Sequence, residues 1–386
     1  MATDALSRED LEQLATRQGD PCVSIFLPTH RVSLETEQDR IRLGNLLSTA
    51  EKRLKEQGVR HVQDLLRPGA ELLDDPEFWR HQDDGLALFI SDGFSARYRL
   101  PLELPERLHI GNTFQVKPLL PLLSGNGVFY LLSLSQNQVG MYRASKQRME
   151  PVDIPELPES LAWALRFDER EYQLQLHSQT GGAAGAQGDR AAMFHGQGVG
   201  TDDEKDRVER FCRKVDKGLS EYLTPRKAPL VLAAVEYVAS IFKEVSTYQG
   251  LVPQVVEGNP RDLSGEQLHH KAWEAVRQEF ERPRNEALDR YQRLAGTGKT
   301  GAGLEEVLPA AAKGKVDSLF AAGSAEAFGT FDAQSFQLDV HEQKGKEDLD
   351  LLDEACRQTL LKGGDVYILP ADQVPGEEDV AAVYRF

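Results

Sequence analysis

The stretch FHGQGVGTDDEKDRVERFCRKVDKGL, residues 194–219, passes from a glycine-rich loop directly into an amphipathic helix. Gln197 lies between Gly196 and Gly198 at the tip of this loop. Its amide does not titrate near neutral pH, so it can act only through hydrogen bonds, which suits positioning a water or a carbonyl. The two glycines permit unusual backbone angles and close approach to a partner. The alternative is a polar loop residue without a role.

The helix that begins near Asp202 has two distinct faces when its residues are spaced at about 100°. The apolar face, which predicts packing on a sheet, consists of Val208, Phe211, Val215, Leu219 and Tyr222. The basic face, a candidate contact for RNA phosphates, consists of Arg207, Arg210, Lys214 and Lys217. Because acidic residues share this helix, a solvated face with salt bridges is the alternative.

The segments around this helix predict a middle domain over residues 118–261. A hairpin is expected around residues 135–138, and a strand in 228–237 precedes a helix in 238–248 and a further strand at 251–258. Residues 179–200 are rich in glycine and lack large apolar side chains, so we expect a mobile loop there.

The flanking segments predict two further α/β domains, over residues 1–117 and 262–386. In the first, Ser7 and Asp10 resemble a helix cap, and strands 21–29 and 84–92 enclose a helix at 33–57. The last domain, expected to be an α/β sandwich, has a long helix at 262–296 that we expect to be interrupted or kinked near Pro283. Its strands are expected at 316–321, 366–369 and 380–386. Strands that alternate with helices indicate an α/β fold with a substantially parallel sheet.

Composition restricts the class of protein. The chain has 386 residues, of which 40% are hydrophobic and 28% charged, as in globular proteins. It has no apolar run of about 18 residues that could cross a membrane, and its first residues do not form a secretory signal. Three widely spaced cysteines argue against disulfides and fit a cytoplasmic location. The net charge of −17 opposes nucleic-acid binding unless a basic patch exists locally.

Two other motifs do not indicate a site. Gly298-Lys299-Thr300 matches the end of a phosphate-binding loop, but Arg293 occupies the position of its first glycine, and a helix precedes it where a strand is required. A turn between helices fits better. His269 and His270 are adjacent on a predicted helix, point about 100° apart and cannot easily share a metal. We therefore expect no metal site and no cofactor.

The order of these features resembles the bacterial archaeo-eukaryotic release factor-like family, within the peptide-chain release factor and Pelota superfamily. The glycine-rich loop, the basic helix and the following strand carry part of the resemblance. The C-terminal stretch with Gly314, Val316 and Asp317 before a strand is more specific. The resemblance extends from about Val116 to Phe386, and the release factors' stop-codon-reading motif is not found in the first domain.

The resemblance implies functions for the residues already singled out. His195, Gly196 and Gln197 match the Gly-Gly-Gln motif of release factors, whose glutamine helps water attack the peptidyl-tRNA ester, with histidine in place of the first glycine. The implied partners are the ribosome, peptidyl-tRNA, rRNA and a translational GTPase, in termination, rescue or quality control of translation. A non-enzymatic ribosome-binding or hibernation factor and a protein-interaction module unrelated to the ribosome are the alternatives.

Overall fold

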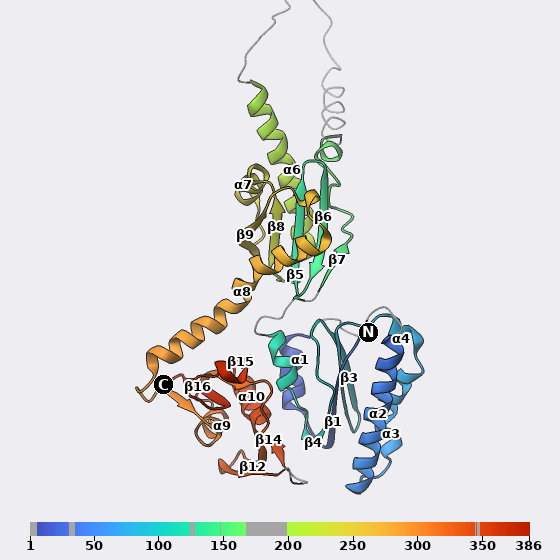
Figure 1. The fold of residues 1–386 in the computed structure, drawn as a ribbon, viewed down its shortest axis with the longest axis vertical. Helices are drawn as coiled ribbons and strands as arrows, with labels where there is room; N and C mark the ends of the chain where they lie inside the picture. Colours follow the sequence, from blue (N-terminus) through green and yellow to red (C-terminus); the bar gives the residue numbers. More distant parts are fainter. Residues whose placement is uncertain are drawn as a thin grey trace, which may run out of the picture. The chain divides into compact units, whose positions relative to one another are not determined.

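The computed structural model describes residues 6–30, 35–123, 128–146, 148–166, 199–343, 345 and 348–386. The chain forms two compact units (Figure 1). The terminal unit combines Met1–Gly127 with Phe280–Phe386, and the middle unit consists of Val128–Glu279. The contacts group the first and last segments of the chain into one unit. The three domains predicted from the sequence stay a prediction.

The N-terminal segment of the terminal unit is an antiparallel sheet in the order β3-β2-β1-β4. Alternate residues of β1 point to opposite faces: Val23, Ile25 and Leu27 pack against α2, α3 and α4, whereas Cys22 and Phe26 enter a second core. The elements of this segment are α1 (Arg8–Thr16), β1 (Gln18–Pro28), α2 (Glu35–Glu56), α3 (Val62–Leu73), α4 (Pro76–Arg80), β2 (Gly85–Ser91), β3 (Phe94–Leu100), β4 (Arg107–Thr113) and the 3₁₀ helix η1 (Lys117–Leu122).

The C-terminal segment has a sheet in the order β10-β16-β11-β15 and a small sheet in the order β13-β12-β14. Its elements are β10 (Thr300–Ala302), α9 (Leu304–Ala312), β11 (Val316–Ala322), β12 (Phe328–Asp332), β13 (Gln337–His341), β14 (Leu349–Asp350), α10 (Leu351–Leu361), β15 (Asp365–Leu369), η3 (Ala371–Gln373) and β16 (Val380–Tyr384). The strands predicted at 316–321 and 366–369 are confirmed as the parallel pair β11 and β15.

One hydrophobic core joins the two segments of the terminal unit. It contains Phe26 and Phe89 from the N-terminal sheet together with Leu308 and Leu352 from α9 and α10. Residues Leu351 to Leu360 of α10 are all buried, so this helix lies at the centre of the unit. Such a helix must bury its polar residues as well as its apolar ones, and each of these polar groups needs a partner.

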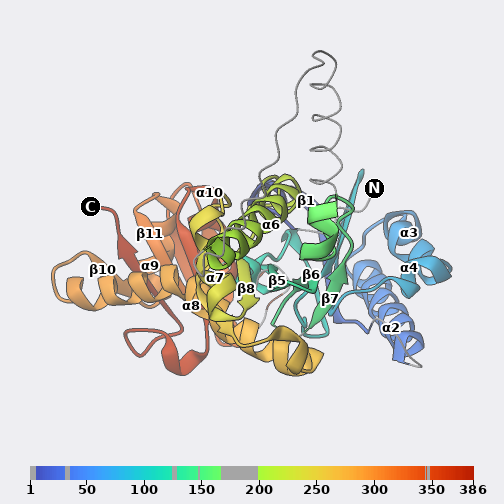
Figure 2. The ribbon, with the colours of Figure 1, turned by 90° about the horizontal axis from the view of Figure 1, so that it is seen from above.

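The middle unit has a five-stranded sheet in the order β7-β6-β5-β8-β9. Viewed from above, α6 and α7 lie on one side of this sheet and the first part of α8 on the other (Figure 2), where Trp273 of α8 contacts Phe129 of β5. The elements are β5 (Phe129–Ser135), β6 (Gln138–Ala144), β7 (Met149–Val152), a short helix at 161–166, α6 (Val199–Leu223), β8 (Leu230–Ala234), α7 (Glu236–Val245), β9 (Leu251–Glu257), η2 (Pro260–Asp262) and α8 (Gly265–Leu294), which continues into the terminal unit.

Two predictions about the fold are wrong. The sheets are not substantially parallel: in the described part of the chain, only β5 with β8, β8 with β9, and β11 with β15 pair in parallel. Short turns join the antiparallel pairs β2–β3, β5–β6, β6–β7 and β12–β13, whereas the other antiparallel pairs join strands that are farther apart in sequence. The predicted interruption of the long helix is also wrong, because Pro283 lies inside the continuous helix α8, whereas a kink there stays a prediction. Pro283 is exposed, so water can hydrogen-bond the carbonyl that this proline leaves without a donor.

Two further findings concern the ends of helices and their length. The predicted cap of the first helix is confirmed, because Ser7 and Asp10 form a reciprocal capping box at α1. Among the helices in the described residues, none combines the length and the apolar character required to span a bilayer.

Candidate functional site

The predicted catalytic residues His195, Gly196, Gln197 and Gly198 lie outside the described residues, as does most of the predicted mobile loop at 179–200. The structure does describe the chain on both sides of them. The short helix at 161–166 and helix α6 belong to the same unit, where Lys214 Nζ donates a hydrogen bond to the carbonyl of Ala164, with a length of 2.9 Å. Both sides of the intervening segment are therefore fixed to one folded body.

The apolar face predicted for α6 is confirmed. Its fully buried residues are Val208, Phe211, Cys212, Val215, Leu219 and Leu223. They pack with β5, β8 and α7 in the core of the middle unit. Gly218 extends this close packing, because a Cβ atom there would lie 2.8 Å from the carbonyl oxygen of Glu156. The sequence period thus fixes which face of α6 contacts the sheet and which faces away.

The four predicted RNA-contacting cations differ in their surroundings. Arg207, Arg210 and Lys217 are exposed on α6. Lys214 is partly buried, and its ammonium group binds the Ala164 carbonyl, so its first role in the free protein is structural. Arg213 lies on another part of the helix surface and forms an exposed ion pair of 2.7 Å with Glu209. The basic face that solvent reaches therefore consists of three cations.

Asp216 anchors α6 to the end of α7. Its carboxylate is buried and accepts hydrogen bonds from Ser246 Oγ at 2.8 Å, from Thr247 N at 3.0 Å and from Thr247 Oγ1 at 2.7 Å. In the sequence Asp216 reads as one of the acidic residues that surround the basic face. Its spacing from the apolar residues gave no indication of this anchoring role.

Replacing Asp216 by alanine is expected to destabilise the middle unit by about 1.5–3 kcal/mol, because three donors lose a charged acceptor. The three free cysteines are buried in the two units, so their labelling by a thiol reagent reports the stability of each unit separately. Cys212 in α6 should label about 10- to 150-fold faster in the variant, whereas Cys22 and Cys356 in the terminal unit should label as in the wild type. The exposed Asp206→Ala change is the matched control. Equal labelling of Cys212 in both variants would contradict the anchoring role.

The two motifs that were set aside have structural explanations. Residues 295–303 form a turn and the short strand β10, and the Lys299 carbonyl accepts a hydrogen bond from Tyr384 N in β16. His269 Nε2 lies 2.8 Å from the carbonyl oxygen of Ser145, which fixes the start of α8. Within the described residues, no group of three or more histidine, cysteine or acidic side chains is placed to hold a metal ion.

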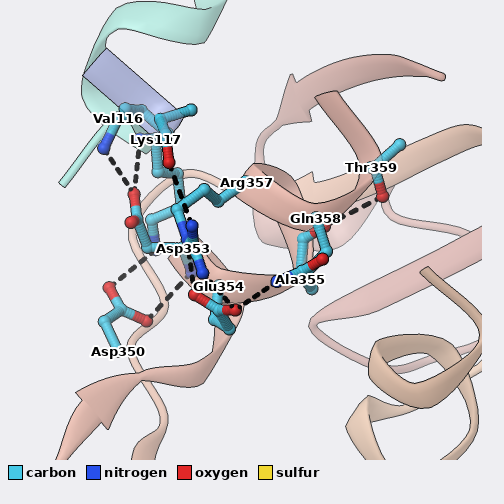
Figure 3. Close-up of polar contacts among 10 residues, drawn as sticks. Val116, Lys117, Asp350, Asp353, Glu354, Ala355, Arg357, Gln358 and Thr359 are labelled. Atoms are coloured by element: carbon cyan, nitrogen blue, oxygen red, sulfur yellow. Dashed lines mark hydrogen bonds and ion pairs between the residues drawn. The ribbon is translucent and has the colours of Figure 1, made fainter. Parts of the chain in front are cut away.

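Sequence reasoning missed a polar cluster in the terminal unit where η1 meets α10 (Figure 3). Asp353 Oδ1 accepts hydrogen bonds from Val116 N at 2.8 Å and Lys117 N at 2.6 Å. Asp350 caps α10 through Leu352 N at 3.1 Å. The available signal was the run LDLLDEACRQTLL, in which charged residues interrupt an otherwise apolar buried helix.

A second part of this cluster is a buried ion pair on α10. The guanidinium of Arg357 binds both carboxylate oxygens of Glu354 at 2.7 Å. It also donates a hydrogen bond of 2.9 Å to the Ala15 carbonyl at the end of α1. Gln358 Nε2 adds a bond of 2.8 Å to Glu354. These contacts satisfy both charges, as burial requires.

The middle unit also matches a known family. Residues 129–278 match the model of bacterial archaeo-eukaryotic release factor family 7. The predicted resemblance to bacterial release factor-like proteins is confirmed for this region. The match begins with β5 and ends within α8, so it covers the sheet, helix α6 and the residues for which a loop is predicted. No curated protein sequence matches the chain.

Several solved structures are similar over nearly the whole chain, at low identity. An archaeal translation termination factor, aRF1, is 15% identical over 99% of both chains, with a TM-score of 0.25. Pelota of Archaeoglobus fulgidus is 12% identical over 98% of this chain and 92% of its own, with a TM-score of 0.28. Dom34 of S. cerevisiae is 11% identical over 98% and 93%, with a TM-score of 0.39. Because these TM-scores are low, only the match of residues 129–278 to the family model supports a functional proposal.

Proposed function

We propose that this protein is a ribosome-associated factor of the release-factor type, which presents the loop around Gln197 toward the end of peptidyl-tRNA. The observation that carries the proposal is the family match of residues 129–278, which include the Gly-Gln sequence and the whole of α6. The described side chains support it in one respect: Arg207, Arg210 and Lys217 form an exposed basic face on the helix that directly follows the loop.

In this proposal the two parts of the site have separate tasks. The basic face contacts phosphates of rRNA or tRNA, which gives affinity without sequence specificity. Gln197 positions the water that attacks the peptidyl-tRNA ester, while Gly196 and Gly198 allow the loop to enter a narrow site. The chain as a whole has a net charge of −17, so its remaining surface orients this face toward RNA by repelling RNA elsewhere. A translational GTPase is a further proposed partner.

The binding part of the proposal has a quantitative test. Removing a cation that contacts a phosphate lowers the slope of log affinity against log salt by roughly 0.7–0.9. The combined change Arg207→Ala, Arg210→Ala and Lys217→Ala should therefore lower the slope for ribosome binding by about 2 to 3. Lys214 is left intact because it also holds Ala164.

Arg213→Ala is the control for the effect of each charge, since it removes one positive charge from the same helix at a position paired with Glu209. It should leave the slope nearly unchanged. Cosedimentation with ribosomes over a range of salt concentrations measures both variants. If the slope falls no more for each removed charge in the triple variant than in the control, the basic face is only solvated and does not contact RNA phosphates.

A second candidate function is a non-enzymatic factor that binds the ribosome and blocks this site. His195 favours it, because this residue occupies the place of the first glycine of the release-factor motif and its Cβ restricts the backbone there. Release of labelled peptide from stalled ribosomes distinguishes the candidates. His195→Gly restores the family motif, so release by this variant alone would favour the blocking function, whereas release by the wild type favours the hydrolase.

A further inference from the structure

The polar cluster of the terminal unit contains two buried carboxylates and one buried ammonium group. Asp350, Asp353 and Lys117 are each less than 9% exposed. Lys117 Nζ lies 3.6 Å from Asp350 Oδ2, and it donates a hydrogen bond to the Ala325 carbonyl. Gln115 Nε2 donates to the same Asp350 oxygen at 3.1 Å. The cluster therefore carries one more negative than positive charge when both carboxyl groups are ionised.

The groups that surround this cluster do not compensate the extra charge. Glu354 and Arg357 on α10 neutralise each other. Cys356 is buried on the same helix, and burial raises the pKa of its thiol well above the ordinary value, so it stays neutral. Among the described residues, α1 and α9 contribute no buried polar side chain, and β11 contributes Ser318, which is uncharged.

Other titratable or charged groups lie near the cluster: His341, which pairs with Asp348 and, like Asp350, lies opposite Phe328; the Arg107–Glu326 ion pair next to Ala325; and His109 on β4. His109 pairs in register with Ser24, and Ser24 Oγ accepts a hydrogen bond from Gln115 N, so both side chains lie on the face toward the cluster.

We propose that Asp350, Asp353 and Lys117 form a proton-dependent latch between the end of the N-terminal segment and helix α10. The latch is closed while Asp353 carries a proton, and it loosens when that proton is lost.

The geometry supplies a place for this proton. A protonated Asp353 keeps Oδ1 as the acceptor for Val116 N and Lys117 N, because the proton can reside on Oδ2. Gln115, which donates to Asp350 in the same cluster, has a buried Oε1 acceptor that receives no hydrogen bond from any described residue. Loss of the proton leaves two buried carboxylates beside one buried ammonium group, so the cluster carries an uncompensated negative charge. Separation of η1 from α10 would expose this charge to water.

Burial, followed by the charge of Asp350, raises the pKa of Asp353 to about 7. In the unfolded chain this pKa is near 4. The closed state therefore binds more protons than the open state between these values, so its stability is greatest at acidic pH and falls as pH rises toward 7. Above this pH the dependence ends, since the carboxyl group is ionised in both states.

Hydrogen exchange of the full-length protein tests the latch. After correction for the intrinsic effect of pH on amide exchange, the opening constant of amides in η1 and α10 should rise about tenfold from pH 6 to pH 8. Most of this rise should occur below pH 7. Amides of α7 in the middle unit serve as the internal reference and should show no such rise.

The variant Asp353→Asn keeps the size of the side chain and an acceptor oxygen but cannot ionise. It should abolish the tenfold rise and should exchange no faster than the wild type at pH 8. His109→Gln is the matched control for titration of the neighbouring imidazole and should retain the rise. An unchanged rise in Asp353→Asn, or its loss in His109→Gln, would overturn the latch.

Discussion

Replacing Gln197 by alanine is expected to reduce the rate of peptide release by about 100- to 1000-fold, or about 2.7–4 kcal/mol of transition-state stabilisation. This is the loss expected when one preorganised donor or acceptor is removed from a hydrolytic site. The substitution changes no charge, so ribosome affinity and its salt dependence should remain those of the wild type. Separate measurements of binding and release on the same stalled complexes give both quantities.

The loop provides its own control. Gln187 also precedes a glycine in the same glycine-rich segment, so Gln187→Ala removes an identical side chain from a comparable sequence. It should leave the release rate unchanged. Equal rates in the Gln197 and Gln187 variants would exclude the hydrolytic role of Gln197, and loss of ribosome binding in the first variant would show that the amide contributes affinity.

The sequence predicted those features of the fold that depend on local patterns. The spacing of Phe211, Val215 and Leu219 identified the buried face of α6, and the Ser7–Asp10 pair identified the start of α1. Each of these signals arises within a few turns of helix. The predicted parallel sheet was wrong because the pairing of strands distant in sequence depends on contacts that no local pattern records.

The polar interior of the terminal unit could not be predicted for the same physical reason. Asp353 lies more than 230 positions from the backbone amides of Val116 and Lys117 that it binds. In a sequence, an acidic residue in a helix is normally assigned to solvent. Its burial here follows from the packing of two segments from opposite ends of the chain onto α10, which places an acidic residue where water is excluded.

In the candidate site, too, some features follow from a local sequence pattern and others depend on contacts between distant residues. The cations of α6 and the Gln197 motif stay a prediction as a site, and the structure distinguishes Lys214, which holds Ala164, from the exposed cations. The anchoring of α6 by Asp216 through Ser246 and Thr247 required three-dimensional contacts. Together these contacts fix the helix that follows the loop, as a binding site on a rigid element requires.

The buried pair of Glu354 and Arg357 should give the largest effect on stability. Arg357→Met is expected to destabilise the terminal unit by about 3–5 kcal/mol, because it leaves the Glu354 carboxylate buried without its cation. It also removes the donor to the Ala15 carbonyl that links α10 to α1. Labelling of Cys22 and Cys356 should become about 100-fold to several thousand-fold faster, while Cys212 in the middle unit labels at the wild-type rate.

Two controls separate the buried charge from the loss of packing. Lys55→Met breaks an exposed ion pair with Glu51 on α2 and should leave the labelling of Cys22 and Cys356 nearly unchanged. The double change Glu354→Leu with Arg357→Met removes both buried charges and should recover most of the stability lost in the single variant, since a buried pair is often replaceable by apolar residues. If the double variant is as unstable as Arg357→Met, the hydrogen bond from Arg357 to Ala15 determines the stability, and the charge of Glu354 does not.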